Sequence, residues 1–277
     1  MAAWQSGDVV ANGIKIHYHR TGGGRPPLVL SHGATDNGLC WTRLAGALES
    51  DFDVIMPDAR GHGLSDAPEQ GYGGAERAAD LAAFIGALVL ERPAVGGHSM
   101  GAGTTLRLVA DHPGLASCAI LEDPGFRDAP PSEAEQADRA ARMREQAAAR
   151  RAASRQALID QCRTDNPTWA EEELGPWAEA KQQVSLSFAG GLRLAERPDW
   201  RELLPKVSCP VLLITADPER GGIVTPEIAA EAARLAPDLE VVRLPGAGHN
   251  VRREQFDAYL GAVRAFLARV GAGALTG

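Results

Sequence analysis

Near the start of the chain, apolar and polar residues follow the pattern of two short strands. Residues 8–11 predict one strand, and residues 14–18 alternate apolar and polar side chains, which indicates a second strand with one buried face. Asn12 and Gly13 stand between the two segments, and Asn-Gly strongly favours a two-residue β-hairpin turn. The chain is therefore expected to begin with an antiparallel hairpin.

Further along, short runs of consecutive apolar residues alternate with segments of helical periodicity. A strand that helices cover on both faces gives such an unbroken apolar run. This alternation predicts an α/β domain with a mostly parallel sheet and helices on both faces. The apolar runs span residues 27–31, 54–57, 94–97, 116–121, 211–215 and 241–244.

The alternation is interrupted between the run that ends at Leu121 and the run that begins at Val211. More than 80 residues there carry no strand pattern, whereas connections in α/β units usually have about 2 to 6 residues. We therefore predict a helical cap over residues 125–206, inserted into a core formed by residues 1–124 and 207–277.

Two helix starts are expected inside this cap. Ser132 and Glu135 have capping-box spacing ahead of a long stretch rich in Ala, Arg and Glu that runs to about Arg163. Asn166 followed by Pro167 predicts the N-cap and first residue of another helix. Six arginines on the first helix are interleaved with carboxylates, which is interpreted as a solvated face.

Composition and charge argue against several functional classes for this chain. The 277 residues include 28 Lys and Arg against 36 Asp and Glu, and the formal charge of −8 argues against a nucleic-acid surface. The longest apolar run, 81–90, is shorter than the roughly 20 residues of a bilayer span, and no signal peptide is expected from residues 1–8. Four cysteines without paired spacing predict reduced thiols in a cytoplasmic protein.

A chemical motif follows the third of these apolar runs. Residues 97–101 have the sequence Gly-His-Ser-Met-Gly, a G-x-S-x-G pattern between a predicted strand and a helical stretch over 104–111. The pattern is typical of a tight, strained turn that exposes the central serine. Glycines at 97, 101 and 103 are expected to let helix and strand approach. Ser99 is therefore the candidate nucleophile, and we expect a structural role for His98.

Three further motifs accompany this turn, and with them the chain resembles the α/β-hydrolase superfamily from about Leu28 to Leu267, the cap excepted. The motifs are His32-Gly33-Ala34, Asp58-Ala59-Arg60-Gly61-His62-Gly63-Leu64-Ser65 and Gly248-His249. The resemblance implies the α/β-hydrolase fold, a mostly parallel eight-stranded sheet flanked by helices, with the helical cap inserted between strands 6 and 7.

The resemblance also implies a catalytic triad. Ser99 is expected to be the nucleophile and His249 its base, because a serine hydroxyl needs an adjacent base at neutral pH. Asp217 is expected to be the acid, since it follows the strand that ends at residue 215. The alternatives that stay open are Glu219, from the commoner family spacing, and Glu122 or Asp123, at the end of the previous strand.

An oxyanion hole and a substrate pocket complete the expected site. The backbone N–H groups of Ala34 and Met100 are expected to bind the oxyanion. Trp41, Phe126 and Trp169 are candidates to line an apolar pocket under the cap. The sequence shows no metal-ligand cluster, and neither a metal nor a cofactor is expected.

These expectations converge on a serine hydrolase that cleaves a small carboxylic ester or lactone through an acyl-enzyme. An alternative is a hydrolase of a carbon–carbon bond in a vinylogous diketone, as in the meta-cleavage hydrolases with the same triad. A further alternative is a ligand receptor with very slow turnover. The expected partner is a small molecule and neither nucleic acid nor membrane, while the oligomeric state, a homodimer included, stays open.

Overall fold

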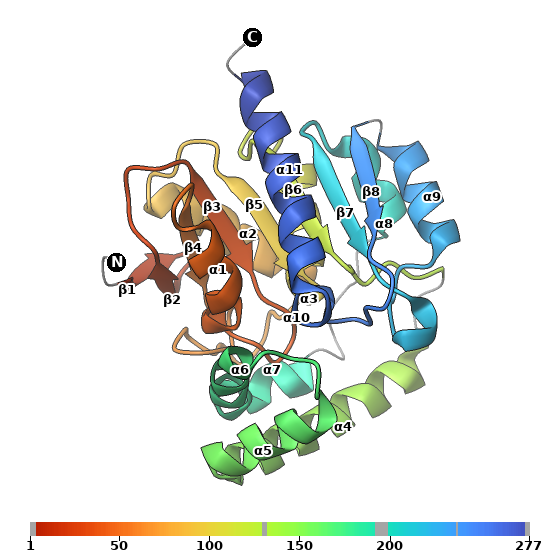
Figure 1. Cartoon of the computed structure of the whole chain (residues 1–277). Helices are drawn as coiled ribbons and strands as arrows, with labels where there is room; N and C mark the ends of the chain where they lie inside the picture. Colours follow the sequence, from red (N-terminus) through yellow and green to blue (C-terminus); the bar gives the residue numbers. More distant parts are fainter. Residues whose placement is uncertain (1–3, 129–131, 192–198, 237, 275–277) are drawn as a thin grey trace.

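The computed structural model of the chain describes residues 4–128, 132–191, 199–236 and 238–274. Its centre is an eight-stranded sheet in the order β1-β2-β4-β3-β5-β6-β7-β8 (Figure 1). β2 pairs antiparallel with β1 and β4, and all pairs from β4 to β8 are parallel, which confirms the predicted α/β sheet. The strands are β1 (Gln5–Ala11), β2 (Ile14–Arg20), β3 (Pro27–Ser31), β4 (Asp53–Pro57), β5 (Ala94–His98), β6 (Cys118–Glu122), β7 (Val211–Thr215) and β8 (Leu239–Arg243).

The predicted amino-terminal hairpin is confirmed. Ala11 pairs with Ile14, so Asn12 and Gly13 alone form the turn. Both turn residues have positive φ, 50° and 77°, as a type I′ turn requires.

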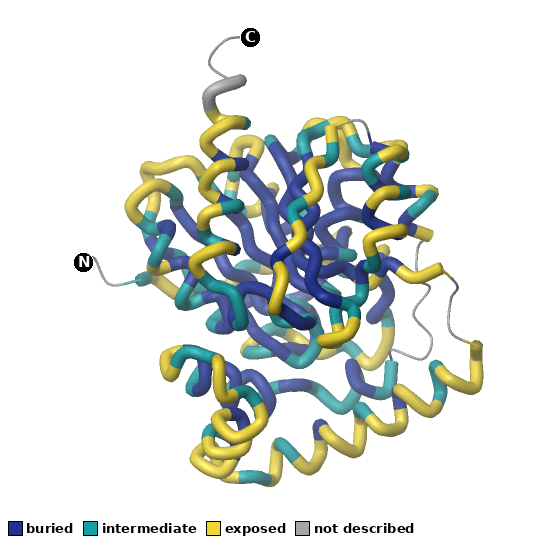
Figure 2. The backbone as a smooth tube through the Cα atoms, turned by 45° about the vertical axis from the view of Figure 1, so that its right-hand side comes forward, coloured by how far each residue is buried: buried dark blue, intermediate teal, exposed yellow. Residues whose placement is uncertain are grey.

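Apolar side chains on the two faces of the sheet pack into two separate cores. Leu28 and Leu30 of β3 pack with α1 and α11 on one face, whereas Val29 packs with α2, α3 and α9 on the other. Figure 2 shows the central strands as the most deeply buried part of the molecule. The helices are α1 (Thr42–Leu48), α2 (Gly74–Ala87), α3 (Met100–Asp111), α9 (Pro226–Leu235), α10 (Val251–Glu254) and α11 (Phe256–Ala274).

Among the residues that the structure describes between β6 and β7, four helices form a cap at one end of the sheet (Figure 1). The outer side of this cap is largely exposed (Figure 2). Its helices are α4 (Glu133–Ala152), α5 (Arg155–Asp165), α6 (Glu171–Gln183) and α7 (Leu186–Gly191). The short helix α8 (Trp200–Leu203) packs in the sheet core and not in the cap, because Trp200 stacks on Phe126 with ring centroids 4.8 Å apart.

The capping box is present, but two other predictions for the cap are wrong. Ser132 accepts from the Glu135 N–H and the Glu135 carboxylate accepts from the Ser132 N–H, which starts α4. The helix does not continue to Arg163, because Ser154 caps a new helix, α5. Asn166 does not start a helix: it is the C-cap of α5, and α6 begins at Glu171.

In the part of the chain that the structure describes, no helix is both long and apolar enough to cross a bilayer. The four cysteines are free thiols, and Cys40, Cys118 and Cys162 are buried.

Candidate active site

Ser99 lies in the turn between β5 and α3. Its φ of 53° and ψ of −109° form a strained combination for a residue other than glycine. The Ser99 N–H donates to the Glu122 carbonyl oxygen at 2.9 Å, which ties the turn to the neighbouring strand. A Cβ on Gly97 would collide with the backbone of Gly101, and a Cβ on Gly101 would collide with the carbonyl group of Ser31. Helix and strand therefore meet so closely here that both positions require glycine.

His249 lies in the loop between β8 and α10 and lines the same cavity as Ser99. The His249 Nδ1 and the Asp123 Oδ2 are 2.6 Å apart. Because a carboxylate only accepts hydrogen bonds, Nδ1 carries the proton and the Nε2 of the neutral ring can accept one. Asp123 is fully buried and also accepts from the N–H groups of Ile223 and Val224. The fold thus fixes a carboxylate and an imidazole in the relative orientation that a triad needs.

Asp217, which the sequence favours as the acid, does not contact His249, so this prediction is wrong. Its Oδ1 accepts from the Arg243 guanidinium at 2.7 Å, and its Oδ2 accepts from the Gly246 N–H at 2.7 Å. These two interactions, with that of Gly246 the larger, lower the pKa of Asp217. The carboxylate therefore holds the loop that carries His249 and not the imidazole ring.

The other candidate acids occupy different environments. Glu122 is fully buried, its pKa is raised by burial, and it pairs with Arg252 at 3.2 Å. Glu219 is exposed in the loop after β7. Of the four carboxylates that the sequence proposed, it is Asp123 that contacts the imidazole.

His98, the residue before Ser99, holds the backbone of His249. Its Nε2 donates to the His249 carbonyl oxygen at 2.9 Å, and the two rings lie 4.7 Å apart. Burial, with a contribution from the neighbouring His249, lowers the pKa of His98 well below its usual value. The ring is therefore neutral at physiological pH, with its proton on Nε2.

The residues expected to supply the oxyanion donors both border one apolar cluster. Ala34 lines the cavity beside Ser99, and the side chains of Ala34 and Met100 pack in one apolar cluster. Met100 is the first residue of α3, where a backbone N–H has no partner within its own helix. Thr35, the residue after Ala34, has φ 66°, so this segment makes a tight turn at the cavity wall.

The cavity lies between cap and core and has a volume of about 490 Å³. Its charged lining residues are four cations and two carboxylates, although the chain as a whole carries a formal charge of −8. The surplus of positive charge inside the cavity favours an anionic ligand. The charged residues are Arg139, Arg150, Lys181, Arg253, Asp36 and Asp165.

The three aromatic residues proposed for the pocket lie in different places. Trp169 lies in the cavity wall, together with Trp177. Trp41 is buried in the core beneath Arg252, and Phe126 is buried against Trp200, so both predictions are wrong. Both side chains pack against the sheet because both residues belong to core segments: Trp41 ends a short helix over 38–41, and Phe126 lies four residues after β6.

Two cap arginines that had been interpreted as part of a solvated face line the cavity. Arg139 and Arg150 are eleven residues apart on α4, which is three helical turns, so both lie on the same face as Met143 and Ala147. Within the described residues neither guanidinium has an ion-pair partner, and partial burial lowers the pKa of both. The sequence signal was this spacing around small and apolar residues, and the interleaved carboxylates obscured it.

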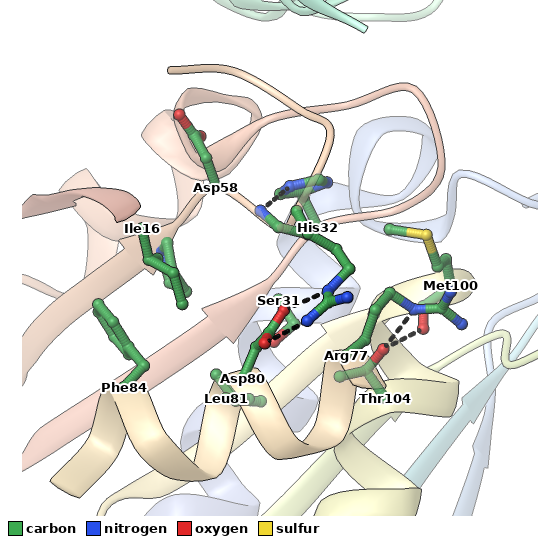
Figure 3. A pocket seen from close by; sticks show the side chains of 14 residues that line it. Ile16, Ser31, His32, Asp58, Arg77, Asp80, Leu81, Phe84, Met100 and Thr104 are labelled. Atoms are coloured by element: carbon green, nitrogen blue, oxygen red, sulfur yellow. Dashed lines mark hydrogen bonds and ion pairs between the residues drawn. The ribbon is translucent and has the colours of Figure 1, made fainter. Parts of the chain in front are cut away.

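A second, small cavity of about 40 Å³ is lined by residues of α2 and of the first turns of α3, among them Arg77, Asp80 and Met100 (Figure 3). Asp80 forms a buried pair with the Arg60 guanidinium, with contacts of 2.5 and 2.6 Å. Asp58 accepts from the N–H groups of Gly38 and Leu64. Asp58 and Arg60, the charged residues of the motif over 58–65, therefore hold neighbouring loops together beside the site.

Three comparisons with known proteins identify the family of this chain. The model of the "Alpha/beta hydrolase family" matches residues 28–262. The chain is 32% identical to N-formylmaleamate deformylase of Pseudomonas putida, over 94% of this chain and 96% of that protein. It is 29% identical to 2-(acetamidomethylene)succinate hydrolase of Mesorhizobium japonicum, over 92% of both chains. A crystal structure of E-2-(acetamidomethylene)succinate hydrolase superposes with a TM-score of 0.80 at 26% identity, covering 96% of this chain and 100% of the other.

Proposed function

This chain is a hydrolase of the alpha/beta hydrolase family, and from that premise we propose that it cleaves a small N-acyl substrate that carries carboxylate groups. The observation that carries the proposal is the placement of Ser99 and the Asp123-bound His249 on one cavity with a surplus of cations. The catalytic triad is then Ser99, His249 and Asp123.

In the proposed reaction the Ser99 Oγ attacks the acyl carbon while the His249 Nε2 takes the hydroxyl proton. The N–H groups of Ala34 and Met100 donate to the oxyanion of the tetrahedral intermediate. The C–N bond then breaks as His249 returns the proton to the leaving nitrogen. Water, activated by His249, releases the acyl group from Ser99 as a carboxylic acid and restores the hydroxyl. Asp123 stabilises the imidazolium that forms in both steps.

The relatives support this choice of bond over an ester or lactone. Their names denote a formyl group on an amide nitrogen and an acetamido group, the first in a molecule with one carboxylate and the second in a molecule with two. In the second, the nitrogen is conjugated through a carbon–carbon double bond, which brings it closer to the vinylogous diketone of the alternative prediction than to a simple ester. Arg139 and Arg150 provide the charge that such carboxylates need.

The proposal is tested with a substrate panel. The wild-type protein should turn over N-formylmaleamate or 2-(acetamidomethylene)succinate many times per active site, with kcat/KM well above that for p-nitrophenyl acetate or a dienoate. Ser99→Ala should lower kcat by about 10⁴-fold or more. Preference for the ester, or a single stoichiometric acylation, would instead support the ester or receptor predictions.

The cavity arginines have a matched control on the same helix. Arg139→Gln and Arg150→Gln should each raise KM for the carboxylate substrate by about tenfold, because a charge-assisted hydrogen bond contributes about 1.5 kcal/mol. Turnover of neutral p-nitrophenyl acetate should stay within about twofold. Arg142 pairs with Asp138 on the exposed side of α4, so Arg142→Gln should leave both substrates unaffected. Equal effects of all three variants would contradict the anionic substrate.

A further inference from the structure

Six charged side chains lie buried together beneath the cavity, and we call them the buried charge cluster. None is more than 5% exposed. Burying charges carries a desolvation cost that their mutual attraction only partly offsets, so such a cluster needs an explanation other than stability alone. Its members are the cations Lys181, Arg252 and Arg253 and the carboxylates Asp36, Glu122 and Glu173.

Asp36 is the centre of this cluster. It lies two residues after Ala34, in the segment that follows β3. Its Oδ1 lies 2.8 Å from the Lys181 Nζ, and its Oδ2 lies 3.2 Å from the Arg253 guanidinium. Burial alone would raise its pKa, but Arg253, Lys181 and Arg252 hold the pKa of Asp36 well below its usual value. The carboxylate is therefore ionised and fixed.

Lys181 is the member of the cluster that reaches from the cap to the two residues after Ala34. It lies on α6, and its Nζ donates to the Asp36 carboxylate and also to the Thr35 carbonyl oxygen, each at 2.8 Å. The two partners are 145 and 146 residues away along the chain. The Lys181 ammonium of the cap thus forms hydrogen bonds with two successive residues of the core.

Thr35 has a backbone conformation that its branched side chain disfavours. Its φ of 66° lies in the left-handed region, which β-branched residues rarely adopt. The surroundings supply two contacts to its backbone: Lys181 at the carbonyl, and the His62 Nε2, 3.4 Å from its N–H. The direction of the chain between Ala34 and Asp36 depends on this residue.

We propose that Lys181 is a positioning residue for the oxyanion hole: by holding Thr35 and Asp36 it aims the Ala34 N–H at the reacting carbonyl, so the cap helps to build the catalytic site. The inference rests on the proposed function, because it assumes that Ala34 donates to an oxyanion. It assigns α6 a role in the rate of the reaction, in addition to covering the cavity.

The expected consequence is a loss in kcat and not in KM. An oxyanion donor acts mainly in the transition state. Lys181→Met keeps the aliphatic stem and removes the ammonium, so kcat should fall by about 10- to 100-fold. Asp36 already offsets the charge of Lys181 and keeps Arg253 as a partner in the variant, so KM should change by less than about threefold. Gln182 is the matched control, since its amide donates to Ala153 inside the cap at 2.8 Å. Gln182→Met should leave kcat within about twofold.

A second substitution separates positioning from general support of the cap. Glycine adopts positive φ without cost, so Thr35→Gly in the Lys181→Met background should restore kcat at least threefold. If Lys181 only stabilises the cap, Thr35→Gly restores nothing, and the proposal is overturned. Should Lys181→Met unfold more than about 10 °C below wild type, Lys181→Arg replaces it. That variant keeps the charge but moves the donors, so kcat should still fall about 3- to 10-fold, and an unchanged kcat overturns the proposal.

Labelling by a fluorophosphonate probe distinguishes this inference from the proposed function. Phosphonylation of Ser99 places a phosphoryl oxygen in the oxyanion hole, so the labelling rate of Lys181→Met should fall by a factor similar to that for kcat. Wild-type protein that resists labelling at Ser99 overturns the proposed function, and this role with it. Equal labelling of wild type and Lys181→Met overturns the role of Lys181 alone.

Discussion

The proposed acid, Asp123, rests on one contact between two side chains. Asp123 and Asp217 follow neighbouring strands, β6 and β7, at the same edge of the sheet. Asp217 is engaged by Arg243 and Gly246, whereas Asp123 lies 2.6 Å from His249. The two carboxylates follow neighbouring strands but make different contacts: Asp123 binds the imidazole, and Asp217 holds the loop that carries it.

Substituting each aspartate tests this difference. In Asp123→Asn the amide can donate to Nδ1 and so favours the wrong imidazole tautomer, and kcat should fall by about 10³- to 10⁴-fold. In Asp217→Asn the loop loses a charge but the triad stays, so kcat should change by less than about threefold. Steady-state kinetics measure both, with thermal unfolding as the check on folding. Similar losses in the two variants would contradict the assignment of Asp123.

At the scale of elements, helix α3 and the turn before it determine how Ser99 is presented. The sequence predicted that the glycines at 97, 101 and 103 all let helix and strand approach. Gly97 and Gly101 do so, but a Cβ on Gly103 would have no atom outside its own helix within 4 Å. Gly103 is therefore not required by packing.

The two glycines of α3 should respond in opposite directions to alanine. Gly103→Ala should stabilise the protein by up to about 1 kcal/mol, because alanine favours the helix and nothing obstructs its methyl group. Gly101→Ala should destabilise it by about 2 kcal/mol or more, since the methyl group would meet the backbone of Ser31, which cannot move aside as a flexible side chain can. Urea unfolding measures both free energies. Equal effects would show that the close approach at Gly101 is relieved elsewhere.

At the scale of the whole molecule, the chain buries several ionisable groups close to the site. His32 donates from Nδ1 to the Gly33 carbonyl and accepts from the Ala59 N–H on Nε2, so its ring is neutral. Burial lowers the pKa of His32, and lowers those of His62 and His98 well below the usual value. Folding therefore opposes protonation at these three positions beside the site.

The stability of the protein should consequently fall in mild acid. A histidine of the unfolded chain binds a proton near pH 6.5, whereas these three stay neutral to lower pH in the folded protein. Below about pH 6.5 the unfolded state thus binds more protons, and the free energy of unfolding decreases as pH falls, by at most about 1.4 kcal/mol per pH unit for each histidine. The raised pKa of Glu122 acts in the opposite direction and offsets part of this slope.

Urea unfolding between pH 7 and pH 5 measures the slope. His62→Gln removes one of the three groups and should lower the slope by up to about 1.4 kcal/mol per pH unit. A free energy of unfolding that stays constant or rises towards pH 5 would contradict neutral burial of these histidines.

The sequence by itself determined the strands, the hairpin, the inserted cap, and Ser99 and His249 as candidate nucleophile and base. Each depends on local periodicity, on turn chemistry within a few residues, or on the order of motifs along the chain. Ser132 and Glu135 starting α4 are an example, since both partners lie within one helical turn.

The tertiary structure alone decided which carboxylate meets His249, which aromatic residues face the cavity, and that Arg139 and Arg150 line it. It also brought Lys181 of the cap onto Thr35 and Asp36. The contacts of Asp123 with His249 and of Asp36 with Lys181 join residues more than 100 positions apart. In the sequence, several carboxylates were chemically equivalent candidates for the acid, and several aromatic residues were equivalent candidates for the pocket. The choice among equivalents depends on loop paths and helix orientation, which are set by packing of the whole chain and leave no local pattern in the sequence.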